Sequence, residues 1–254
     1  QTISSFGTLA LSNSNYALTG ASGSVVIQKA VLTATATVSD KSYDGDDSAV
    51  VSLSLSGLVG TEDLDQTVTA RFDSTDAGTR TATIDSFSLD NGTNGAASNY
   101  SLASDAITFT SNTATIAQKA LTATATVAGK TYNGDDSAAV TLSLSGLVGL
   151  EDLDQTVTAS FDSANAGTRT ATIDSFSLDD GTSGLASNYS LVSGDIAFTS
   201  NTATIAQKAL GYTGSATASN KIYDGGLSAT ADISGLTFTG LLPGDSLGTA
   251  SAVF

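Results

Sequence analysis

The feature that most constrains this chain is an internal repeat. Residues 32–38 (LTATATV) return unchanged at 121–127, and residues 77–89 (AGTRTATIDSFSL) return at 166–178, an offset of 89 residues in both cases. Such a period indicates tandem copies of one small domain. We expect four parts: the end of a preceding copy at 1–28, a first repeat at 29–118, a second repeat at 119–207, and the start of a third copy at 208–254.

Within each copy the apolar residues follow a period of two. In residues 32–38 Leu, Ala and Val alternate with Thr, which predicts a β-strand with one buried face. The same alternation recurs at 51–55, 68–72, 80–89, 100–102, 107–109 and 114–116. Its phase shifts between Ile84 and Phe87, which indicates a β-bulge.

The density of strands narrows the fold class. About seven short strands per copy are typical of a small β-sandwich, so we expect an all-β, elongated array of Ig-like domains. The alternative is a β-grasp-like repeat with one short helical turn around residues 60–64, where Thr-Glu-Asp suits a helix start.

Composition excludes several classes of function. The chain has no His, Cys, Met or Trp, so it lacks the usual general acid–base, thiolate and zinc-binding side chains, and we expect no enzyme and no catalytic residues. With a formal charge of −16 and 9 basic residues, nucleic acid is not an expected partner. No signal peptide or apolar stretch of membrane-spanning length is visible, and we expect an interior piece of a longer protein with no membrane insertion in this segment.

Several motifs recur in a fixed order. Lys-x-Tyr-Asp-Gly stands at 41–45 and 221–225, with Asn replacing Asp at 130–134. Phe72 is followed by Ala-Gly-Thr at 77–79, and Ala-Ser-Asn-Tyr-Ser-Leu occupies 97–102 and 186–191. This order resembles the YDG/MBG-type repeats of filamentous-haemagglutinin-like bacterial surface adhesins, and the resemblance covers essentially the whole chain.

That resemblance implies an extracellular fibre on a bacterial cell surface, at the outer membrane of a Gram-negative cell. The repeats would then be structural stalk or spacer modules of a large adhesin, extending a distal binding region for cell adhesion or biofilm formation. Their expected partners are the neighbouring repeats and other copies of the fibre. The alternatives are a repeat module that itself binds glycan or calcium, or one that self-assembles into an extracellular fibre.

The tyrosine–glycine motif has a structural interpretation. Asp-Gly or Asn-Gly supplies the backbone conformation of a tight turn, and the tyrosine covers the end of the core. The residues concerned are Tyr43, Gly45, Tyr132, Gly134, Tyr223 and Gly225. Clustered carboxylates also suit calcium, the one cofactor that the sequence suggests, at Asp44, Asp46, Asp47, Asp135 and Asp136. The spacing does not match an EF-hand, and Asn133 weakens the charge.

Other polar residues have simpler interpretations. We interpret Glu62, Asp63 and Asp65, which recur in the second repeat, as solvated loop charges rather than a glycosidase pair. Asn99-Tyr100 and its counterparts are interpreted as strand entries with an edge-anchoring tyrosine. Isopeptide bonds from the recurring lysines are an alternative for which no triad can be placed; the residues are Lys29, Lys119 and Lys208, or Lys41, Lys130 and Lys221.

Overall fold

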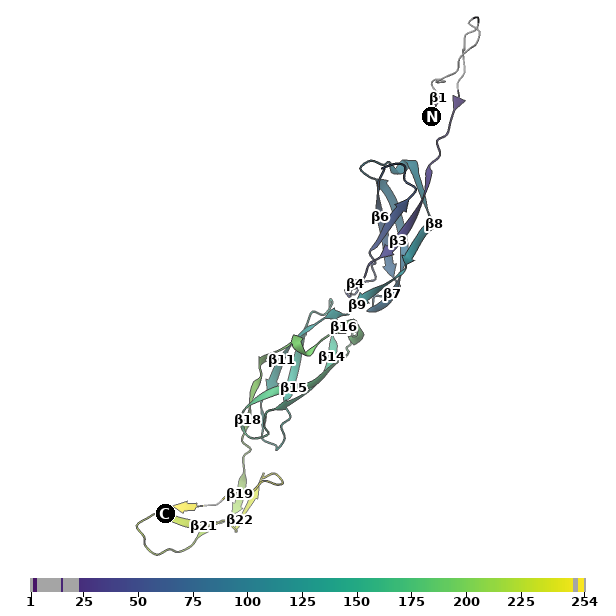
Figure 1. Cartoon of the computed structure of the whole chain (residues 1–254). Helices are drawn as coiled ribbons and strands as arrows, with labels where there is room; N and C mark the ends of the chain where they lie inside the picture. The colour runs from purple at the N-terminus through teal and green to yellow at the C-terminus, as the bar shows by residue number, and fades with distance from the viewer. Residues whose placement is uncertain (1, 4–14, 16–22, 249–250, 254) are drawn as a thin grey trace. The chain divides into compact units, whose positions relative to one another are not determined.

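The structure is a computed structural model that describes residues 2–3, 15, 23–248 and 251–253. The chain divides into two compact units, Gln1–Gln118 and Lys119–Phe254, each of which is described by itself. Strands dominate both units (Figure 1), and the helices of the described part are three single 3-10 turns, so the fold is all-β. Among these residues no helix has the length and apolar character needed to span a membrane. The expected tail of a preceding copy, at 1–28, lies mostly outside the described residues.

The first unit contains nine strands and one 3-10 turn. They are β1 (Thr2–Ile3), β2 (Gly23–Ser24), β3 (Ala30–Val38), β4 (Lys41–Ser42), β5 (Val51–Ser56), β6 (Leu64–Phe72), β7 (Gly78–Asn91), η1 (Ala97–Asn99), β8 (Tyr100–Ser111) and β9 (Thr113–Ala117). Apart from the β1–β2 pair, the strands form two sheets, ordered β5-β3-β8 and β4-β9-β7-β6. β3 is antiparallel to β5 and parallel to β8, and β4 is parallel to β9.

Both sheets contribute to one core. The inward residues of β3, Leu32, Ala34 and Ala36, are at most 3% exposed, while the threonines between them face solvent. Ala34 and Ala36 pack with residues of the other sheet, among them Val68 and Ile84. Because Ala34 and Ala36 have small side chains, they bury little apolar area per residue.

The second unit repeats this plan with two of its strands divided. Its elements are β10 (Lys119–Ala120), β11 (Thr122–Ala128), β12 (Lys130–Thr131), β13 (Ala139–Ser145), β14 (Leu153–Phe161), β15 (Gly167–Asp180), η2 (Ala186–Asn188), β16 (Tyr189–Ser190), η3 (Ser193–Asp195), β17 (Ile196–Ser200) and β18 (Thr202–Ala206). The sheets β13-β11-β17 and β12-β18-β15-β14 match those of the first unit. The counterpart of β8 is divided into β16 and β17 by η3, and the counterpart of β3 is divided into β10 and β11. β10 pairs in parallel with β16 as a separate two-stranded sheet.

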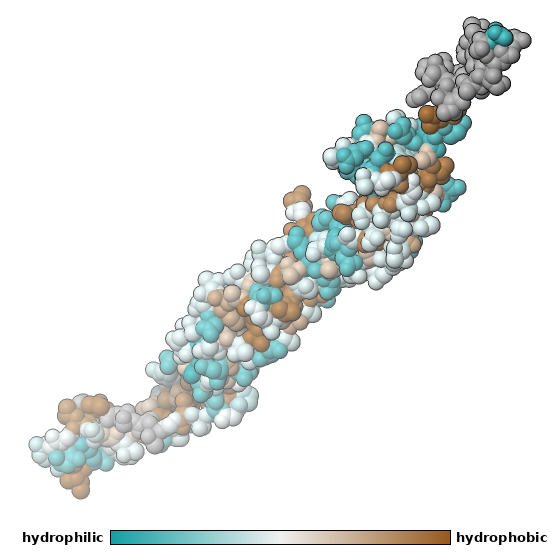
Figure 2. Space-filling model, turned by 45° about the horizontal axis from the view of Figure 1, so that its top comes forward, coloured by the Kyte–Doolittle hydropathy of each residue, from teal (hydrophilic) through white to brown (hydrophobic). Residues whose placement is uncertain are grey.

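The third copy adds shorter strands to the second unit. They are β19 (Gly211–Gly214), β20 (Thr217–Ala218), β21 (Ser228–Asp232), β22 (Leu236–Thr239) and β23 (Ser251–Val253). β19 pairs with β22, and β21 pairs with both β20 and β23. On the face drawn in Figure 2, hydrophilic and hydrophobic residues are interspersed, as alternation of Thr or Ser with small apolar residues predicts.

The strand pattern expected from the sequence holds with two corrections. The bulge is confirmed, since Thr69 pairs with Ser86 and the next residue, Ala70, pairs with Ile84. The helical turn considered at 60–64 is wrong: these residues form a hydrogen-bonded turn, in which Glu62 N–H donates to Val59 O at 3.1 Å. The strands expected at 100–102 and 107–109 are one strand, β8, in the first unit.

Candidate functional site

A lysine closes the motif turn of the first repeat. Lys41 Nζ lies 2.7 Å from Asp44 Oδ1 and 2.9 Å from Asp46 Oδ1, and it also donates to the carbonyl oxygens of Asp46 and Ser48, both at 3.2 Å. Asp46 in turn accepts the N–H of Ser48 at 2.8 Å. The loop oxygens therefore converge on the ammonium group of Lys41, which acts as their shared donor.

The second repeat keeps this arrangement although Asn133 replaces the first aspartate. Lys130 Nζ donates to Asp135 Oδ1 at 2.5 Å, to Asp135 O at 2.9 Å and to Ser137 O at 3.0 Å. Asn133 Nδ2 now donates to the other oxygen of Asp135 at 2.7 Å. One carboxylate is thus enough to hold the lysine.

In the third copy the other acidic position is absent, because Gly226 stands where Asp46 and Asp135 stand. Lys221 Nζ donates to Asp224 Oδ1 at 2.7 Å, to Gly226 O at 2.7 Å and to Ser228 O at 3.0 Å. The three turns consequently share a lysine, at least one carboxylate and two carbonyl oxygens.

These contacts perturb the pKa values of the turn. Burial alone would lower the pKa of Lys41, but the hydrogen bonds to Asp44 and Asp46 outweigh it and raise that pKa. The hydrogen bond from Lys41, then those from Ser48, lower the pKa of Asp46 to about 2. In the second repeat, Lys130 and Ser137 lower the pKa of Asp135 to about 2 in the same way.

The tyrosine and glycine of the motif have separate tasks. Tyr43 is 5% exposed and its N–H donates to Ala117 O at 2.8 Å, so it joins the turn to β9. Tyr132 packs against the core cluster of the second repeat and makes the matching bond. Gly45, Gly134 and Gly225 have φ values of 85°, 88° and 73°, which explains the need for glycine. Tyr223 of the third copy is 92% exposed.

The calcium candidates are placed by the structure as parts of this turn. Asp44, Asp46 and Asp135 hold the lysine, which takes the position that a cation would occupy. Asp47 and Asp136 are exposed, and their carbonyl oxygens accept the N–H of a phenylalanine on the neighbouring strand. Within the described part of the chain no three acidic side chains come together as a metal-binding group. Calcium binding stays a prediction, and it would require displacement of the lysine.

A second contact in each repeat involves the two glutamates of the chain. Tyr100, 3% exposed, donates its hydroxyl to Glu62 Oε2 at 2.5 Å and accepts the N–H of Val59 at 3.0 Å. In the second repeat Tyr189 donates to Glu151 Oε2 at 2.6 Å and accepts the N–H of Val148 at 2.9 Å. The strand-entry tyrosine therefore fixes the turn after β5 or β13, and we call this contact the tyrosine latch.

The latch perturbs the tyrosines. The hydrogen bond to Glu62 raises the pKa of Tyr100. Burial, followed by the hydrogen bond to Glu151, raises the pKa of Tyr189 to about 12. Both tyrosines keep their hydroxyl proton at neutral pH. Each hydroxyl therefore donates to the carboxylate of its glutamate, and the contact is a charge-assisted hydrogen bond.

The interpretation of these acids as solvated loop charges is wrong for the two glutamates, which are half-buried and hydrogen-bonded to a tyrosine, whereas Asp63 and Asp65 are exposed. Asp63 Oδ1 accepts the N–H of Asn94 at 2.8 Å, and an added Cβ at Gly95 would lie 2.2 Å from Asp63 O. A sequence signal for the latch does exist: Glu62 and Glu151 are the only glutamates in an aspartate-rich chain, and each precedes a tyrosine by the same interval.

An arginine that the sequence analysis did not single out closes a further loop. Arg80 Nε donates to Asp76 O at 2.8 Å and its NH2 group to Ala77 O at 3.0 Å. Arg169 makes the same pair of bonds, to Asn165 O at 2.7 Å and Ala166 O at 3.1 Å. The Ala-Gly-Thr-Arg segment is therefore a structural loop in both repeats.

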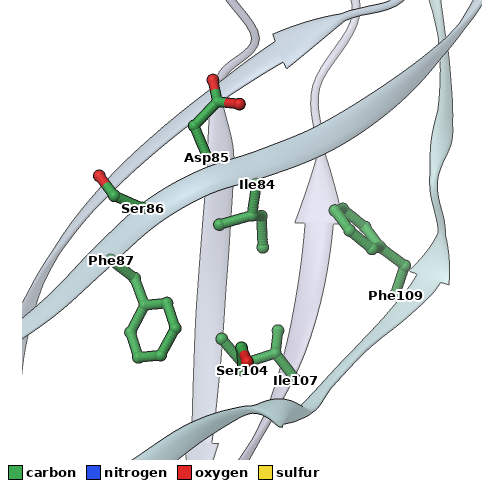
Figure 3. A pocket seen from close by; sticks show the side chains of 7 residues that line it. All are labelled: Ile84, Asp85, Ser86, Phe87, Ser104, Ile107 and Phe109. Carbon is green, nitrogen blue, oxygen red and sulfur yellow. The ribbon is translucent and has the colours of Figure 1, made fainter.

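A groove opens between β7 and β8 in the first unit. Figure 3 shows Ile84 and Phe87 of β7 facing the same space as Ile107 and Phe109 of β8, while Asp85 points away from it. The cavity has a volume of about 430 Å³, and its counterpart between β15 and the β17 region has about 370 Å³. The apolar side chains are half-buried, so the groove is where the core of each repeat reaches solvent.

These features define a class of protein: an all-β chain of tandem repeats whose motif residues hold their own turns. The YDG domain model matches residues 27–108 and 117–203. The chain therefore belongs to the YDG domain family. No curated protein and no solved structure matches it.

The family match corrects the resemblance given above. The family shown is the YDG domain. The identification of the chain as YDG/MBG-type repeats of filamentous-haemagglutinin-like bacterial surface adhesins is therefore wrong, apart from the YDG domain itself. The attributes that came with that identification, adhesin, biofilm and extracellular, gain no support from the match. What remains is the YDG domain and the all-β fold.

Proposed function

We propose that this chain is a structural spacer, in which copies of one domain are joined in series to set a distance. The observation that carries the proposal is the use of the motif residues. In both repeats, matching contacts within one unit are made by the motif turn around the lysine (the lysine turn), by the tyrosine latch, and by the loop that Arg80 or Arg169 closes (the arginine loop). A site for chemistry would instead leave reactive groups directed at a ligand.

The turn chemistry supports this role. Lys41 and Lys130 bridge the loop oxygens of their own turns, so the polar groups of these turns contact each other. The absence of histidine and cysteine removes the commonest catalytic side chains. That the chain is not an enzyme stays a prediction, as does its location at a bacterial cell surface.

Insertion of extra repeats tests the proposal. One or two additional copies of residues 119–207 would be inserted after residue 207, and the maximum dimension measured by small-angle X-ray scattering. We expect a constant increase of about 30–40 Å per inserted copy, the size of a compact domain of this length. An increase that falls off with copy number, as in a growing globule, would contradict the spacer. The same measurement at several protein concentrations tests self-assembly into a fibre.

The finer fold belongs to this proposal as well. We propose that each repeat is a small Ig-like β-sandwich, because the buried alanines of β3 pack with Val68 and Ile84 from the other sheet. Methyl–methyl nuclear Overhauser effects between Ala36 and Val68 or Ile84 are the expected result. If the methyls of the two sheets show no such contacts, the sandwich is refuted.

A further inference from the structure

Within the second unit, the motif turn of the second repeat contacts a loop of the third copy. Tyr132 Oη donates to Asp245 Oδ2 at 3.2 Å and lies 3.5 Å from the other carboxylate oxygen. The hydrogen bond from this hydroxyl to Asp245 raises the pKa of Tyr132. The two residues belong to different copies of the repeat, 113 residues apart in the chain.

The loop that carries Asp245 fits the turn in shape. An added Cβ at Gly134 would lie 3.2 Å from Leu242 Cδ1, so the leucine methyl sits directly over the glycine. A small cavity of about 110 Å³ between them is lined by Tyr132, Leu242, Asp245 and the residues Lys208 and Leu210 that follow the second repeat. The turn thus presents a hydroxyl donor beside a backbone surface without a side chain.

Asp245 occupies the same position as the two glutamates of the latch. The pattern Gly-Leu-x-x-x-acid ends at Glu62, at Glu151 and at Asp245. In all three loops the N–H of the acid donates to the carbonyl three residues earlier, at 3.1, 3.0 and 3.1 Å. Since Glu62 and Glu151 accept a tyrosine hydroxyl, this position is a tyrosine acceptor in every copy.

We propose that Tyr132 and Gly134 form a docking site, called the socket, for residues 240–245 of the following copy. Docking of these residues in the socket makes their ordered conformation depend on the second repeat. The proposal deepens the spacer function and rests on it. Side-chain contacts between consecutive copies restrict the orientation of one copy on the next, which the covalent link alone does not. The motif glycine then has two tasks, the turn conformation and the seat for Leu242.

Hydrogen exchange of the full chain, measured by mass spectrometry on peptides covering 236–248, tests the socket. Tyr132→Phe and Asp245→Asn should each raise exchange there about three- to tenfold, the net worth of one ordinary hydrogen bond, because the contact is exposed to solvent. Because both variants break the same contact, the double variant should exchange no faster than the faster single variant. Tyr43→Phe, the same substitution in the other unit, should leave these peptides unchanged.

Three outcomes overturn the proposal. The first is that the amides already exchange at unprotected rates in the parent chain. The second is that the single variants match the parent, and the third is that their effects multiply in the double variant.

A titration of the phenol is a second readout of the same contact. The difference in tyrosinate absorbance between the parent and Tyr132→Phe reports Tyr132, which should titrate above its ordinary pKa of 10.0. In Asp245→Asn the same difference should move toward 10.0. An unmoved titration refutes the contact, whereas the scattering experiment with inserted repeats is unaffected by failure of the socket.

Discussion

Removal of one hydroxyl from the tyrosine latch of the second repeat should destabilise that repeat measurably. Tyr189→Phe keeps the ring, which is 2% exposed, and deletes the bonds to Glu151 Oε2 and to Val148 N–H. A pKa raised from 10.0 to about 12 corresponds to a preference of the folded state for the neutral phenol. At about 1.4 kcal/mol per unit this preference, up to about 2.7 kcal/mol, sets the pH dependence of stability, because burial of the phenol is its first cause. The loss at pH 7 is that of a hydrogen bond to a charged group, about 1.5–3 kcal/mol. We expect a loss of about 2 kcal/mol at pH 7.

The pH dependence of this loss has a definite sign. Because the folded pKa of Tyr189 lies above the unfolded value, its contribution is complete below pH 10 and disappears as the pH rises through about 12. At pH 11 the difference between the parent and Tyr189→Phe should have shrunk by about 1.4 kcal/mol.

Urea unfolding of the full chain, followed by circular dichroism at pH 7 and pH 11, measures both quantities. Tyr212→Phe is the matched control in the same unit, since Tyr212 is 68% exposed. It should change the free energy of unfolding by no more than about 0.5 kcal/mol. A loss below about 0.3 kcal/mol for Tyr189→Phe, or a loss equal at the two pH values, would refute the reasoning.

Three further predictions concern the second unit. Because the pKa of Asp135 is lowered to about 2, its contribution to the free energy of unfolding is complete above the ordinary pKa of 3.8 and is lost as pH falls to about 2. Lys130→Met should reduce this loss of stability at acid pH in unfolding experiments, and an unchanged loss would exclude the lysine as its cause. An added Cβ at Gly184 would lie 2.4 Å from Asp152 O, so Gly184→Ala should cost about 1–3 kcal/mol in urea unfolding. Gly194→Ala, with open space around it, should cost less than about 0.5 kcal/mol, and equal losses would contradict the argument. Arg169→Met should speed hydrogen exchange at 163–168, where its guanidinium bonds two carbonyl groups; unchanged exchange there would show that the loop does not need it.

The strands were largely predictable because their signal is local. Alternation of Thr with Leu or Ala defines β3, and the phase shift before Phe87 marks the bulge. Partner choice carries no such local signal: the parallel pairing of β3 with β8 joins residues about 70 positions apart, and β4 has only two residues. The helical turn at 60–64 failed because a helix-favouring triplet does not outweigh a turn fixed by contacts.

The position of the motif turn was predictable from Asp-Gly, but the role of the lysine in it was not. Clustered aspartates suggested calcium, which stays a prediction, and the contacts of Asp44 and Asp46 with Lys41, only a few residues earlier in the chain, were not foreseen. The latch was missed because Glu62 and Tyr100 lie 38 residues apart, and only folding brings them together. Comparison of the repeats with each other contained the signal, in the two glutamates and the two tyrosines at the same offset.

The two acidic positions of the lysine turn give it redundancy. The first repeat has both acids, the second has lost Asp44's counterpart to Asn133, and the third copy has Gly226 in place of the other. Either position can therefore accumulate substitutions as long as the other keeps its carboxylate. Adjacent copies can in this way diverge in sequence without loss of the turn, and divergence between neighbours disfavours exchange of strands between copies during folding.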